Sequence, residues 1–240
     1  MNYLTVETAG REAAEPTEQS NLFDYVELLL KNRARLSEVL RRGDRLMEVL
    51  PNLLGIALVG FAAYAAIIWA VFNLGGAEAA GLPKFSLASL TLSYTAGLVA
   101  SVGVCLPSFY FYALLAGVKA SMVQIAAQAV RALAVTAILL LGIMPVYLAV
   151  VVGLHIGGDI WRPGYELSIR VGLVLPFLAG FFGVSAFYRG FADLAYTFPP
   201  HRRRTRGRFL RLMALAQSGL YAFVSPFMIH TLLKALDRIF

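Results

Sequence analysis

The chain has 240 residues, of which 59% are hydrophobic and 15% are charged, and its formal net charge is +7. Soluble domains carry about 25% charged residues, so this composition is typical of a membrane protein and excludes an ordinary soluble domain. The positive charge does not predict nucleic-acid binding, because basic residues gather beside membrane spans for topological reasons. The single cysteine, Cys105, excludes a disulfide framework.

Two polar segments precede the apolar part of the chain. Residues 1–20 are expected to form a disordered tail, since they contain four glutamates and Pro16 and few large apolar residues. Residues 21–50 predict a cytoplasmic juxtamembrane helix, because apolar residues recur at helical spacing. The step from Arg42 to Asp44, through Gly43, could divide this helix in two. The helix could dock a partner, lie on the membrane surface, or pack on its own protein.

Long apolar runs predict an all-α polytopic transmembrane bundle over residues 51–236. About 20 apolar residues in a helix cross the hydrocarbon core of about 30 Å. Five such spans are expected, at about residues 53–74, 89–114, 132–154, 171–188 and 212–233.

Each of the last four spans contains one proline, and we expect a helix kink there because proline removes a hydrogen bond of the helical ladder. These residues are Pro107, Pro145, Pro176 and Pro226. The kinks could be ordinary packing features, or they could mark broken helices around a transport site.

Small residues at helical spacing predict close contacts between helices. They include Gly97 with Ser101, Gly180 with Gly183, and the alanines Ala62, Ala66 and Ala70. Such surfaces explain self-packing or partner packing without specifying a function.

A basic cytoplasmic loop is predicted at residues 199–211, where six arginines lie within ten residues. They are Arg202, Arg203, Arg204, Arg206, Arg208 and Arg211. Such a cluster orients the neighbouring spans. It could also contact a partner or anionic lipid headgroups, at about 1 kcal/mol per cation near the surface.

The distribution of positive charge predicts the orientation of the five spans. The proposed inner side carries 16 of the 21 lysines and arginines, so the N-terminus is expected in the cytoplasm and the C-terminus outside. Arginine outnumbers lysine, and alanine and glycine are abundant, which favours a bacterial chain in the inner membrane.

No catalytic, cofactor-binding or metal site is expected. The three histidines, His155, His201 and His230, do not have the spacing of helical metal ligands. A membrane enzyme would need acidic or histidine groups that converge at one membrane face. His155, Asp159 and Glu166 are the only candidates for that role.

The layout resembles the Yip1-like membrane proteins, which have a polar cytoplasmic N-terminal segment, five packed spans and a short outer C-terminal end. The segment Leu114–Ser121, with Gly117 and Lys119, is similar to the glycine-plus-basic turn between spans 2 and 3 of bacterial members. The Asp-Leu-Tyr-Gly-Pro type signature of eukaryotic members is not present before span 1. The resemblance therefore implies an architecture more than a mechanism.

Together these features favour a non-enzymatic membrane scaffold or complex subunit with a basic cytoplasmic face. Its expected partners are the lipid bilayer, anionic headgroups, and other membrane proteins or a second copy of itself. The alternative is a transporter or channel component with kinked helices around a neutral path. A cavity lined by polar groups would support the alternative, the candidates being Thr95, Ser101, Gln124, Thr136, Gln217 and Ser218.

Overall fold

A computed structural model describes residues 22–31, 33–43, 46–73, 85–115, 121–157, 162–195 and 203–236. Within these ranges all the regular elements are helices. In chain order they are α1 (Leu22–Lys31), α2 (Arg33–Arg42), α3 (Leu46–Val71), α5 (Leu87–Leu115), α6 (Met122–Ile156), α7 (Arg162–Ala195) and α8 (Arg203–Leu236). The predicted tail at residues 1–20 lies outside the described residues.

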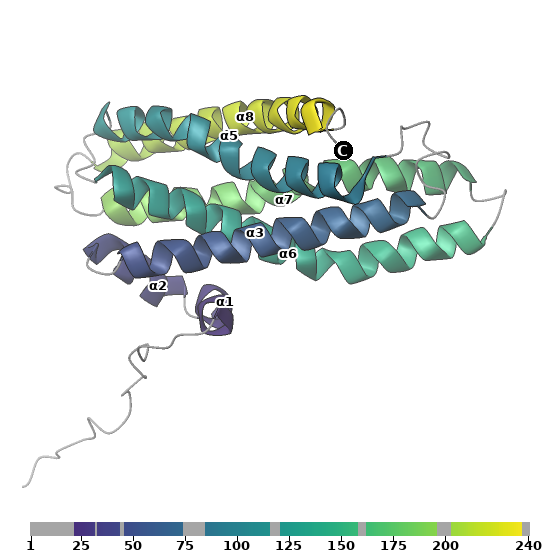
Figure 1. The fold of residues 1–240 in the computed structure, drawn as a ribbon. Coiled ribbons are helices and arrows are strands. Elements are labelled where there is room, and N and C mark those ends of the chain that lie inside the picture. The colour runs from purple at the N-terminus through teal and green to yellow at the C-terminus, as the bar shows by residue number, and fades with distance from the viewer. Residues whose placement is uncertain are drawn as a thin grey trace, which may run out of the picture.

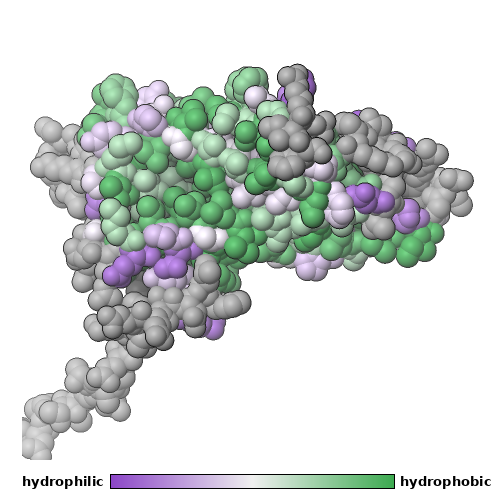
Figure 2. Space-filling model, viewed as in Figure 1, coloured by the Kyte–Doolittle hydropathy of each residue, from purple (hydrophilic) through white to green (hydrophobic). Residues whose placement is uncertain are grey.

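Five of these helices are long and apolar enough to cross a membrane, one for each expected span. Successive long helices run in alternate directions along the bundle (Figure 1). Figure 2 shows an apolar surface along the middle of the bundle, with hydrophilic residues gathered beside α1 and α2 and near the opposite end. The chain is therefore an all-helical protein with five candidate membrane spans.

The helices begin before the predicted spans, whose bounds were set by apolar content and not by helix ends. Helix α8 begins at Arg203, before the predicted span that starts at about residue 212. Helix α6 begins at Met122, before the predicted span that starts at about residue 132. The side chain of Ser121 caps α6 by accepting a hydrogen bond from the backbone of Gln124, whose side chain bonds back to Ser121. Apolar content defines the part of a helix that hydrocarbon can cover, whereas capping and backbone hydrogen bonds define where the helix ends.

The single helix expected at residues 21–50 is instead divided into α1, α2 and the first turn of α3. One division lies at Gly43, whose φ of 84° is favourable only for a residue without a Cβ. A second division separates Lys31 from Arg33 and was not predicted from the sequence.

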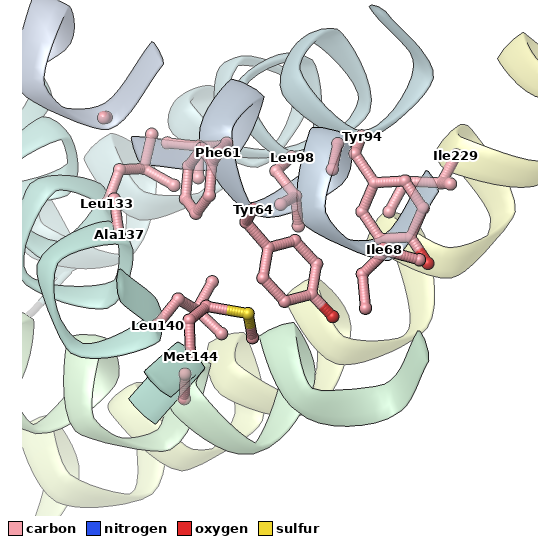
Figure 3. Packing of buried hydrophobic residues seen from close by; sticks show 14 of the residues in the cluster. Phe61, Tyr64, Ile68, Tyr94, Leu98, Leu133, Ala137, Leu140, Met144 and Ile229 are labelled. Carbon is pink, nitrogen blue, oxygen red and sulfur yellow. The ribbon is translucent and has the colours of Figure 1, made fainter. Parts of the chain in front are cut away.

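The long helices form two packed groups. Helices α3, α6 and α7 pack against one another, while α5 pairs with α8 and also contacts α3. Figure 3 shows the core between them, where Phe61, Tyr64 and Leu140 are fully buried. We call the end at which α3, α6 and α8 begin the basic end, because the arginine-rich first turns of α8 lie there.

Helices α1 and α2 cover the side of the bundle near the basic end. Leu36 and Leu40 of α2 are fully buried, and with Leu29 of α1 they join a second apolar cluster that includes residues of α3 and α6. In Figure 1, α1 is seen nearly end-on while the long helices lie across the view, so its axis crosses theirs steeply. Of the three roles left open for this segment, packing on its own protein is the one that these contacts support.

Candidate functional site

Pro176 of α7, one of the four predicted kink residues, is buried in the bundle core. Proline has no backbone N–H, so the carbonyl four residues earlier, that of Gly172, loses its helical partner. Tyr64 of α3 donates its hydroxyl to this carbonyl across the core. An unpaired carbonyl in an apolar interior costs free energy, so Tyr64 supplies the bond that Pro176 removes.

Two more tyrosines surround Gly172. The Tyr94 hydroxyl of α5 lies 3.5 Å from the Leu173 carbonyl, a long contact, and its ring centroid is 5.9 Å from that of Tyr64. A Cβ added to Gly172 would overlap the hydroxyl of Tyr147 on α6. We call Tyr64, Tyr94, Tyr147, Gly172 and Pro176 the tyrosine cluster. It ties α3, α5 and α6 to the segment of α7 around Pro176.

The four kink prolines do not surround one site. Pro176 is buried, whereas Pro107, Pro145 and Pro226 are exposed on the outside of the bundle. All four lie inside helices that continue past them. One of the four prolines is therefore internal, with a hydrogen-bond partner for the carbonyl that it frees, and the other three lie on the outer surface.

The polar residues that would line a transport path do not converge. Ser101 donates to the Leu98 carbonyl at 2.8 Å, and Thr136 donates to the Ala132 carbonyl at 2.9 Å, so both are bonded to their own helices. Gln124 belongs to the cap of α6. Among the described hydroxyls without a hydrogen-bond partner are those of Thr95 and Tyr147. The side chains of Gln217 and Ser218 lie outside the described residues.

A cavity of about 50 Å³ lies between α5, α6, α7 and α8 and is partly open to the surface. Its walls are mainly apolar, and among the expected path residues whose side chains are described, Thr136 alone lines it. The other lining residues are Val102, Phe109, Ala129, Ala132, Leu133, Gly180, Gly183, Val184, Phe187 and Tyr221. We call this the α5–α8 cavity. Its lining suits an apolar group better than a polar solute.

Small residues set the closest helix contacts, as the sequence predicted for Gly97 and Gly183. A Cβ on Gly97 would lie 2.7 Å from Cγ1 of Ile229 in α8, and one on Gly183 would overlap the Thr136 hydroxyl of α6. Gly60 makes an equally close contact with Ala137, which the sequence did not single out.

The alanines Ala62, Ala66 and Ala70 of α3 do not lie on the face that packs inside this chain. Ala62 and Ala66 are half-buried and Ala70 is exposed, whereas Ala57 and Ala65 are fully buried. The buried face was missed because all five alanines look alike in a sequence whose span is apolar on every side.

The predicted basic loop is helical over most of its length. Residues 203–211, which include five of the six arginines, form the first turns of α8, and their side chains are not described. Arg202 and residues 199–201 lie outside the described residues. The backbone therefore presents five cations along the start of one helix.

A buried arginine joins α2 to the bundle at the basic end. Arg131 of α6 is 5% exposed, and it donates a hydrogen bond of 2.8 Å to the Ser37 hydroxyl of α2. On the exposed side of α1, Lys31 and Glu27 form an ion pair of 2.9 Å, and the hydrogen bond from Lys31 lowers the pKa of the Glu27 carboxyl. Both groups of that pair are in water, so it contributes little to stability.

The candidate enzyme residues do not form a cluster within the described part of the chain. His155 lies at the end of α6 and packs against the ring of Tyr165, with 5.2 Å between ring centroids. Asp159 is outside the described residues. Among those that are described, no three histidine, cysteine or acidic residues lie close enough to hold a metal ion.

No family model, curated protein or solved structure matches this chain. The functional argument therefore depends on the bundle itself.

Proposed function

We propose that the chain is a non-enzymatic membrane scaffold or complex subunit, with its N-terminus in the cytoplasm and its C-terminus outside. In this proposal it resides in a bacterial inner membrane and presents the basic end to the cytoplasm. Its arginines, Arg202 to Arg211, contact anionic headgroups, and its lipid-facing helices contact partner proteins. Kinship with the Yip1-like proteins remains part of the proposal, supported by the five-span layout.

The observation that carries this proposal is the weak burial of α8. Only 11% of its span window is buried inside the protein, against 33% to 44% for the other four spans. Its exposed residues recur at intervals of three or four and so form one face. They include Leu212, Leu215, Gly219, Phe223 and Phe227.

This face suits another helix better than it suits lipid alone. Two phenylalanines project from it, with Phe223 78% and Phe227 66% exposed. Between them and the basic end lies Gly219, where a Cβ would meet nothing within 4 Å, so a partner helix has room to approach. We therefore place the partner-binding surface on α8.

The transporter alternative has weaker support. Of its polar candidates, Ser101 and Thr136 bond to their own helices and Gln124 caps α6, and the carbonyl that Pro176 frees accepts a hydrogen bond from Tyr64. An interior of this kind offers little to replace the hydration of a polar solute.

Site-specific photocrosslinking in intact membranes tests the scaffold proposal. A photoreactive residue at Phe223 is expected to give a discrete protein adduct. The matched control is Val146 of α6, which is 67% exposed on another helix and should give only lipid adducts. Equal patterns at the two positions, or no protein adduct at Phe223, would contradict the proposed surface.

A further inference from the structure

The α5–α8 cavity lies where the two helix groups meet. Helix α5 with α8 forms one wall, and α6 with α7 forms the other. Small residues line the space, namely Ala129 and Ala132 of α6 and Gly180 and Gly183 of α7. Its volume of about 50 Å³ is several times the ~10–15 Å³ that a cavity needs, on the same measure, to hold one water molecule. The space can therefore hold part of a ligand.

The chemistry of the walls selects an apolar ligand. Val102, Leu133, Val184 and Phe187 provide aliphatic and aromatic surface, and the Thr136 hydroxyl is already bonded to the Ala132 carbonyl. Cavities with such walls stay dry and take apolar groups. All of the lining residues belong to the five candidate spans, so the surrounding medium is hydrocarbon.

The cavity also lies at a defined depth. Arg211 precedes Tyr221 by ten residues on α8, which is about 15 Å of helix. This distance equals the hydrocarbon depth of one leaflet, half of about 30 Å. A lipid whose phosphate lies near the arginine-rich turns would thus place its chain at the level of the cavity.

We propose that the α5–α8 cavity binds an acyl chain of an anionic glycerophospholipid from the leaflet at the basic end. The chain fills the recess beside Gly180 and Gly183, and the phosphate lies near the first turns of α8. This inference rests on the headgroup contact in the proposed function but not on a protein partner, so it can hold or fail separately from the partner surface on α8.

Phosphatidylglycerol with a diazirine in its acyl chain provides the probe. The full-length protein is reconstituted in nanodiscs of phosphatidylcholine that contain a few per cent of this lipid, and the labelled peptides are mapped by mass spectrometry. We expect labelling on the cavity residues of α5, α6 and α7 at least fivefold above that at Val104 and Val146, which are exposed on the bundle surface.

A matched pair of variants separates cavity binding from general lipid contact. Val184→Phe fills the cavity and should reduce cavity labelling at least fivefold, whereas Val174→Phe, on the exposed side of the same helix, should leave it unchanged. Val102→Phe fills the cavity from α5 and gives an independent test if Val184→Phe does not fold.

Two results would overturn the proposal. One is labelling spread evenly over all lipid-facing residues, or unchanged in both cavity-filling variants. The other is equal cavity labelling by phosphatidylcholine with the same diazirine chain, since a neutral headgroup gains nothing from the arginines of α8.

Discussion

At the residue scale, Tyr64 and Pro176 are linked through one carbonyl oxygen, that of Gly172. Replacing Tyr64 with Phe keeps the ring in the core but leaves this carbonyl without a partner. Hydrogen bonds of this kind contribute about 1 kcal/mol, in water or between membrane helices. We expect Tyr64→Phe to lower the unfolding free energy by about that amount, measured by denaturant unfolding in mild detergent.

The same change at Tyr112, which is exposed near the end of α5, serves as the control and should have little effect. A double-mutant cycle with Pro176→Ala identifies the cause, because an alanine in place of this proline restores the helical N–H for the Gly172 carbonyl. In that background Tyr64→Phe should cost less than half as much. An equal loss of unfolding free energy in both backgrounds would mean that the Tyr64 hydroxyl does not compensate for the N–H that Pro176 lacks.

Gly97 and Gly103 differ in what surrounds them, although both lie in α5. A Cβ on Gly97 would lie 2.7 Å from Ile229, whereas one on Gly103 would meet nothing within 4 Å. Gly97→Ala should therefore destabilise the protein by about 1–3 kcal/mol through overpacking. Gly103→Ala should be neutral or stabilising, because alanine favours a helix. Thermal unfolding of both variants in detergent checks this, and equal behaviour would contradict the observed α5–α8 contact.

Some of these residue contacts could be predicted from the sequence. The contacts of Gly97 and Gly183 were predictable because small residues at helical spacing commonly mark the surfaces where membrane helices approach closely. The pairing of Tyr64 with Gly172 was not, since it joins residues 108 positions apart. The spacing of Gly172 four residues before Pro176 was the available signal, and it identifies the carbonyl but not its donor.

At the element scale, buried leucines hold α1 and α2 against the bundle. Leu36 is fully buried, while Leu30 is 55% exposed. Leu36→Ala should weaken docking by about 2–5 kcal/mol, whereas Leu30→Ala should change it little. Limited proteolysis of reconstituted protein measures this as faster cleavage between α2 and α3 in Leu36→Ala alone. Equal cleavage of both variants and the native protein would show that α2 is not held by this cluster.

The ends of the elements were harder to predict than their presence. The apolar runs located all five long helices, because hydrocarbon requires about 20 apolar residues. They could not show that α8 continues through Arg203–Arg211, because a helix outside the hydrocarbon can carry any number of charges. The boundaries between α1, α2 and α3 depend on local helix breaks. Of these two breaks, only the one at Gly43 was visible in the sequence.

At the scale of the whole molecule, the fold class and the number of long helices could be predicted. Which helices pack against one another could not. Five uncharged spans are apolar on all sides, so no periodic stripe shows which face is buried. The pairing of α5 with α8 and the position of the α5–α8 cavity are therefore known only from the structure.

The arginines of α8 should orient the last span before they serve any other role. Six cations are costly to move across a membrane, so we expect them to hold their end of the helix in the cytoplasm. Replacing Arg202, Arg203, Arg204, Arg206, Arg208 and Arg211 with Gln should give a mixed orientation of the C-terminus. A reporter at Phe240 measures this, and an unchanged orientation would refute the role of the cluster.

The same reporter on the native chain tests the central claim most directly, namely that five spans run from a cytoplasmic N-terminus to an outer C-terminus. Alkaline phosphatase fused after Phe240 should be active, and a fluorescent protein that folds only in the cytoplasm should be dark there. Both reporters should reverse when fused after Ala195, at the end of α7. A fluorescent fusion at Phe240 with inactive phosphatase would contradict the proposed topology.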